Sequence, residues 1–280
     1  MAGYLFILYS SLALGIGPAF TKLSFGHGVD LSLSLASRYC LGITLVFFLV
    51  SQRQVLRDLF TPKSLILAVG YNLVGSFYIA SYLFIPVTAS VVFFFTFPLL
   101  TTLVHALVTR TRVPWLTWGM LICAFIGIVL VVQGAAVALN PVGVALALGA
   151  AVANAVVITF VGPTLEKTGT LPFIALASVM GAPFFLAWAI MTQDFGTVSG
   201  AGWLFNAFVA LFFISGISAY YKAIDRLGPV EAAIFANLEP VVGLVMGVVL
   251  VGEFFGRLQL LGAVMVIAAL AIHVLYKARA

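Results

Sequence analysis

One carboxylate, Glu239, lies inside an apolar stretch that reads IFANLEPVVGLVMG from Ile234 to Gly247. At the centre of a membrane-spanning helix, a charged acid costs on the order of 2.5–3.5 kcal/mol on insertion scales, so it should face protein or water and not lipid. Burial disfavours the charged form of an acid and so makes proton exchange possible. We therefore expect Glu239 to carry a proton or to meet a cationic group of a bound molecule.

The next residue, Pro240, allows a second account of this glutamate. Proline has no N–H, so Pro240 cannot donate to the carbonyl of Ala236 and should kink the helix there. In this account a protonated Glu239 only satisfies polar groups that the kink frees, and both accounts stay open. Pro98 is predicted to kink an earlier helix in the same way.

Hydroxyl and amide side chains in other apolar runs could share a central cavity with Glu239. Tyr71, Gly75, Tyr78 and Tyr82 follow the spacing of one helical face. Tyrosine near a membrane interface is commonly part of an aromatic belt, which is how we interpret Tyr82, and helix packing also uses small polar residues. The residues that we expect to contact a substrate are Asn72, Ser76, Tyr78, Asn154, Ser218 and Tyr220.

The basic residue Arg38 lies seven positions after Leu31, where an apolar run begins, or about 10 Å along a helix. Its side chain could extend outward to lipid headgroups. It could also line an outward vestibule or pair with a carboxylate. We favour a structural or vestibule role over direct substrate binding.

No motif in the sequence predicts catalysis, a cofactor or a metal. Hydrolase, zinc-protease and nucleotide-binding patterns are absent. Cys40 and Cys123 lie in apolar runs without metal-ligand neighbours. Glu231 follows a predicted helix start at Pro229, where an acid complements the helix dipole. We interpret Glu231 as a residue that complements the helix dipole and assign it no other role.

The composition identifies the class of protein. Of 280 residues, 64% are hydrophobic and 8% are charged, whereas soluble domains have about 25% charged residues. The mean hydropathy is +1.24. So few charges cannot cover a soluble fold of this size, so we predict an integral membrane protein and no nucleic-acid partner.

Apolar stretches of helical length divide the chain into ten predicted spans. Each has about 20 residues, enough to cross a hydrocarbon core of roughly 30 Å. They fall at 3–21, 31–51, 64–85, 87–108, 114–133, 141–161, 171–191, 201–222, 229–250 and 258–276.

The basic residues of the connections predict the orientation. If the first residue is cytoplasmic, Lys22 and Arg257 lie outside and ten basic residues lie inside. We therefore expect both ends of the chain in the cytoplasm, in a bacterial-type inner membrane. The ten are Arg53, Arg57, Lys63, Arg110, Arg112, Lys167, Lys222, Arg226, Lys277 and Arg279.

The two halves of the chain, residues 1–139 and 140–280, resemble each other. A shift of 142 positions carries Ser76 and Tyr78 onto Ser218 and Tyr220, and it also carries Pro98 onto Pro240. Because each half has five spans, an odd number, the halves should be inverted relative to each other in the membrane. Inverted repeats are an architecture of secondary transporters, with the substrate near the midplane between the halves.

These features resemble the EamA family of the drug/metabolite transporter superfamily. The resemblance rests on Arg38 in LASRYCLG and on the block GPVEAAIFANLEPVVGLVMGVVLVGEFFGRLQLLGA from Gly228 to Ala263. It implies that the first four spans of each half line a cavity, with the fifth and tenth packing outside. The first half departs from the family pattern, with VVFFFTFP before and at Pro98 and no Gly-Glu pair after that span.

We therefore expect a secondary transporter that exports a small organic molecule such as an amino acid or drug-like compound. Alternating access would use the central cavity, with a proton as a possible coupling ion. A membrane scaffold or an intramembrane enzyme using Glu239 is the alternative. Gly243 and Gly247 form a G-x-x-x-G, a weak indication of a homodimer.

Overall fold

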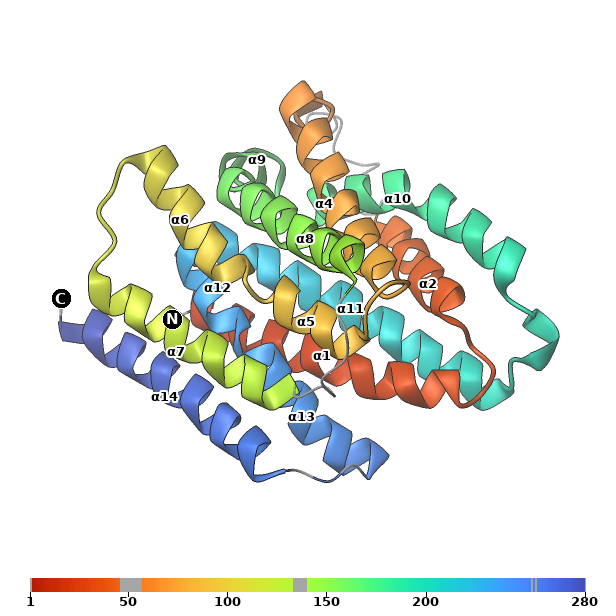
Figure 1. The fold of residues 1–280 in the computed structure, drawn as a ribbon. Coiled ribbons are helices and arrows are strands. Elements are labelled where there is room, and N and C mark those ends of the chain that lie inside the picture. The colour runs from red at the N-terminus through yellow and green to blue at the C-terminus, as the bar shows by residue number, and fades with distance from the viewer. Residues whose placement is uncertain (1, 46–56, 133–139, 253, 255, 280) are drawn as a thin grey trace.

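The computed structural model describes residues 2–45, 57–132, 140–252, 254 and 256–279. Regular structure in these residues is helical throughout, as predicted (Figure 1). The elements are α1 (Ala2–Phe25), α2 (Leu31–Thr44), α4 (Pro62–Ser81), α5 (Val87–Phe94), α6 (Phe97–Thr109), α7 (Trp115–Val132), α8 (Pro141–Phe160), α9 (Gly162–Thr168), α10 (Thr170–Thr192), the 3-10 helix η2 (Phe195–Thr197), α11 (Gly200–Leu227), α12 (Pro229–Ala236), α13 (Leu238–Val251) and α14 (Arg257–Arg279).

The described residues contain nine helical segments that are long and apolar enough to cross a membrane. In this count α5 with α6 is one segment, and α12 with α13 is another. The predicted span at 31–51 begins with α2, but residues 46–51 lie outside the described part of the chain. The protein is therefore an all-helical, multi-pass membrane protein.

Two of these segments are broken, each next to a proline. The residue four before Pro98 is Phe94, where α5 ends, and the residue four before Pro240 is Ala236, where α12 ends. In both cases the proline has no N–H for that carbonyl, so the hydrogen-bond ladder stops there. The helix resumes at Phe97 in the first case and at Leu238 in the second.

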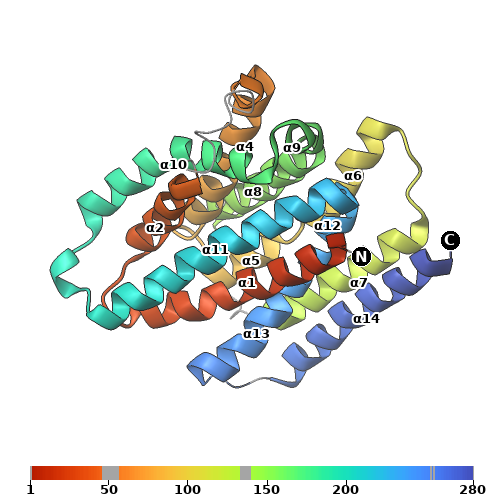
Figure 2. The same cartoon turned by 180° about the vertical axis from the view of Figure 1, so that it is seen from behind.

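Helices of one half of the chain pack against helices of the other. The helix α1 runs along α11 and α13, α8 runs along α4 and α6, and α2 packs on α10. The pairing of α1 with α11 is plain from behind (Figure 2). The main apolar core therefore draws on both halves.

The last helix of each half, α7 and α14, form a pair along one side of the bundle (Figures 1 and 2). Their backbones meet at two glycines. A Cβ on Gly127 would lie 2.7 Å from the carbonyl oxygen of Gly262, and a Cβ on Gly262 would lie 2.4 Å from that of Gly127. Only glycine permits this approach, a packing mode that membrane helices favour.

Candidate functional site

The carboxylate Glu239 lies in the first turn of α13, immediately after the break that ends α12. It is half-buried. Its strongest charged neighbour is Arg38 on α2, whose charge acts on it. Neither side chain forms an ion pair within the described residues. The site thus holds a cation and an ionisable acid that are not joined by an ion pair.

The helix α1 lies directly behind this break. A Cβ on Gly15 would be 2.8 Å from the carbonyl oxygen of Glu239 and 2.6 Å from Cβ of Val242. The hydroxyl of Ser11 donates to the carbonyl of Phe235 at 3.4 Å. The backbone on both sides of the break is therefore held against α1, and Gly15 permits the close approach.

The guanidinium of Arg38 lies inside the bundle, among aromatic rings. Its Nη2 donates to Oγ1 of Thr21 at 3.3 Å, and its Cζ lies 5.2 Å from the ring centroid of Phe213. Its Nε is buried and has no partner among the described residues. A cation with one unpaired donor is available to bind an anionic group.

Aromatic side chains at the end of α4 pack against the end of α5. The Tyr78 ring lies 5.1 Å from that of Tyr82 and 4.5 Å from that of Phe94, the last residue of α5. The charges of Arg38 and Glu239 both act on the phenols of Tyr78 and Tyr82. Tyr82, which we interpreted as an interfacial belt residue, therefore belongs to this cluster.

From the other half of the chain, α11 contributes Tyr220. This side chain is buried, its ring lies 6.0 Å from that of Tyr221, and the charge of Glu239 acts on its phenol. Its hydroxyl has no hydrogen-bond partner among the described residues. Ser218, two residues earlier, also has an unpartnered, buried Oγ in that part of the chain.

The remaining predicted site residues differ in their roles. Asn72 Nδ2 donates to the carbonyls of Ala68 at 2.8 Å and Ala177 at 3.0 Å, which joins α4 to α10. Its Oδ1 is buried without a partner in the described residues. Ser76 and Asn154 are half-buried, and nothing in the described structure brings Asn154 to Glu239.

Some of the predicted site residues carry buried polar atoms that have no hydrogen-bond partner. Seven buried side-chain atoms of the described residues have no hydrogen-bond partner, and four belong to residues singled out from the sequence. An unsatisfied buried polar group costs about 1–3 kcal/mol, so such groups are rare unless something binds them. The four are Arg38 Nε, Asn72 Oδ1, Ser218 Oγ and Tyr220 OH.

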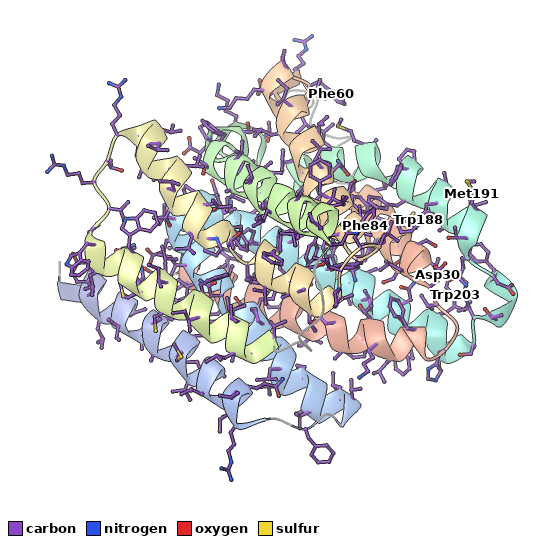
Figure 3. All side chains as sticks on the ribbon, in the orientation of Figure 1. Asp30, Phe60, Phe84, Trp188, Met191 and Trp203 are labelled. Carbon is purple, nitrogen blue, oxygen red and sulfur yellow. The ribbon has the colours of Figure 1, made fainter. Side chains whose placement is uncertain are left out.

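A different set of polar contacts joins the loops at one end of the bundle. The carboxylate of Asp30 caps α2 by accepting from the backbone N–H of Leu33 at 2.8 Å. Gln193 accepts from the N–H of Asp30 at 2.7 Å and donates to the carbonyl of Gly28 at 3.0 Å. Asp30, Met191 and Trp203 lie at this same end (Figure 3). These bonds hold α2 and α10 together there.

Sequence reasoning missed the environment of Glu231. It does lie in the first turn of α12, as expected for a residue that complements the dipole. However, it is buried and bonds Tyr4, His273 and Lys277. The position of Glu231 in the first turn of a helix does not predict that its partners come from the first and last helices of the chain.

Groupings of His, Cys, Asp and Glu that could hold a metal are absent from the part of the chain that the structure describes. The site therefore consists of a cation, an acid, phenols and unpaired hydroxyl and amide atoms. These groups bind polar and aromatic parts of organic molecules.

Comparison with known proteins bears on the family and the fold of the chain. Residues 141–275 match the model of the EamA-like transporter family. A crystal structure of a protein with 17% identical residues gives a TM-score of 0.79, covering 99% of this chain and 98% of that chain, which shows a shared fold. No curated protein matches the sequence. The second half of the chain therefore matches the EamA-like transporter family, which is consistent with a member of the drug/metabolite transporter superfamily.

Proposed function

We propose that the protein is a secondary active transporter of a small organic molecule, such as an amino acid or an amphipathic drug-like compound. The observation that carries this proposal is that Arg38 and Glu239 form no ion pair although the charge of Arg38 acts on Glu239, and that Nε of Arg38 is buried without a partner among the described residues. A molecule with an anionic and a cationic end would satisfy both charges at once.

The arrangement of the helices supports alternating access between two inverted five-helix repeats, residues 1–139 and 140–280. The proline breaks at Pro98 and Pro240 are 142 positions apart, and both interrupt a segment of membrane-spanning length. The packing of α1 on α11 and α13 mirrors that of α8 on α4 and α6. Broken helices next to a substrate site are typical of transporters whose repeats move against each other.

Within this cycle, Arg38 binds an anionic group of the substrate through its free Nε, with Tyr78 and Tyr82 against the apolar part. Glu239 receives the cationic group or, with a neutral substrate, the coupling proton. An acid that alternates between a proton and a substrate cation exchanges the two without leaving a buried charge unpaired. The residues Asn72, Ser76, Ser218 and Tyr220 supply hydrogen bonds around the molecule.

The location and orientation form part of this proposal. The excess of basic residues in alternate connections supports an orientation with both ends of the chain in the cytoplasm, in a bacterial-type inner membrane. Export is the direction that we propose, because the matched EamA-like family consists of transporters that often export their substrates.

The function is tested by two measurements on the purified protein. A thermal-shift screen against amino acids and amphipathic cations identifies a ligand, and vesicle flux then measures its movement. Binding with saturable flux supports the proposal. Binding without flux, in vesicles that contain correctly folded protein, would instead favour a scaffold or an enzyme.

A further inference from the structure

A second buried acidic centre lies away from the proposed substrate site. Oε1 of Glu231 accepts from the hydroxyl of Tyr4 at 2.8 Å. Oε2 lies 3.1 Å from Nε2 of His273 and 2.9 Å from Nζ of Lys277. The side chains of Glu231 and His273 are each 8% exposed, whereas that of Lys277 is 53% exposed. We call these four residues the Glu231 cluster.

The Glu231 cluster joins a short half-helix to two long helices. The half-helix α12 has eight residues, and every residue from Glu231 to Asn237 is buried. Because Pro240 interrupts the hydrogen-bond ladder between α12 and α13, the ladder cannot fix the direction of α12. Contacts with other helices must therefore fix the direction of α12. Among these contacts, the bonds of Glu231 to α1 and α14 are the ones that involve charged groups.

The same cluster reaches the break itself. A small cavity, with room for about one water molecule, is lined by Thr117 of α7, Asn237 at the break and His273 of α14. Nδ1 of His273 is buried and has no partner among the described residues, while Nε2 contacts Glu231. The imidazole of His273 therefore contacts Glu231 and also borders the point where the helix breaks.

We propose that Glu231 is a positioning residue for transport: its bonds to Tyr4, His273 and Lys277 anchor the α12 half-helix to α1 and α14, and their release allows α12 to swing at Asn237. The helix α14 pairs with α7 at the side of the bundle, so the anchor ties α12 to a part outside the substrate site. The role of α12 in transport rests on the proposed function, but the anchor can be tested without a substrate.

The test measures how fast a thiol reagent reaches a buried reporter. In a background with Cys40→Ala and Cys123→Ala, one protein carries Ala233→Cys on α12 and another carries Ala177→Cys on α10. Both alanines are fully buried. Glu231→Gln removes the charge-assisted bonds, so it should speed labelling at position 233 at least about tenfold and change labelling at position 177 by less than about twofold.

Two substitutions of His273 separate its nitrogens. His273→Gln keeps a donor for Glu231 and should label position 233 at nearly the unsubstituted rate. His273→Asn keeps a polar atom on the side of the cavity but loses the contact with Glu231. Like Glu231→Gln, it should therefore speed labelling at position 233 and leave labelling at position 177 nearly unchanged. The control, Glu166→Gln, replaces an exposed acid on α9 and should change neither reporter. If Glu231→Gln does not fold, Lys277→Met removes only the half-exposed partner and carries the same prediction.

Equal acceleration at positions 233 and 177 would show general loosening and would overturn the anchor, as would unchanged labelling at both. If the labelling behaves as predicted but no substrate is moved in vesicles, the anchor stands and the proposed transport function fails. The two proposals are thus decided by different measurements.

Discussion

The close approach of α1 to the helix break can be tested with the substitution Gly15→Ala. A Cβ at this position would lie 2.6 Å from Cβ of Val242 and 2.8 Å from the carbonyl oxygen of Glu239. Both distances are shorter than a van der Waals contact of a carbon atom. Because one of them is to a backbone oxygen, which cannot turn away, α1 and α13 must move apart. Overpacking of this kind costs typically about 1–3 kcal/mol. We expect Gly15→Ala to lower thermal stability and, because the backbone of Glu239 is displaced, to weaken substrate binding.

The matched control is Gly119→Ala in the second turn of α7. A Cβ there would meet nothing within 4 Å. Alanine should therefore be neutral or should stabilise the helix by up to about 1 kcal/mol, since it forms helices better than glycine does. Stability is measured by thermal unfolding in detergent, and binding by titration with the ligand found in the screen. If Gly15→Ala matches Gly119→Ala in both measurements, the approach of α1 to Glu239 is not what positions the acid.

Two further predictions concern the site and the topology. Tyr78→Ala and Tyr220→Ala should each weaken substrate binding at least about tenfold while the protein stays folded, because each removes an aromatic contact and a hydroxyl from the site; unchanged titrations with both would leave these tyrosines as packing residues. Reporter fusions after Lys277 and within residues 57–63 should be active in the cytoplasm, and fusions near Asn140 should be active outside; opposite results at two of these points would overturn the orientation.

The helices and their breaks could be predicted from the sequence because their causes are local. About 20 apolar residues give a span, and the missing N–H of Pro98 and Pro240 acts four residues upstream, where the structure ends α5 and α12. The repeat pairs Tyr78 with Tyr220, and the charge of Glu239 acts on both phenols. That these residues form one substrate site stays a prediction.

The partners of Glu231 could not be predicted, because they depend on contacts distant in sequence. Tyr4 is 227 positions away and His273 is 42 positions away. The position of Glu231 in the first helical turn, where an acid complements the helix dipole, already accounts for this residue. It therefore gives no reason to expect distant partners. For Arg38 the sequence favours a structural or vestibule role, and this stays a prediction. Distance along its own helix could not reveal that the phenols of Tyr78 and Tyr82, in the next segment, lie close enough to act on its charge.

The central claim is that Glu239 works in transport and does not merely fill a helix break. Glu239→Gln keeps the shape and a hydrogen-bonding end of the side chain but cannot ionise. We expect this variant to fold normally and, in vesicle flux measured from about pH 5.5 to about pH 8, either to lose transport or to lose its dependence on pH. Flux equal to that of the unsubstituted protein over this whole range would show that the glutamate is structural and would contradict the proposed function of the site.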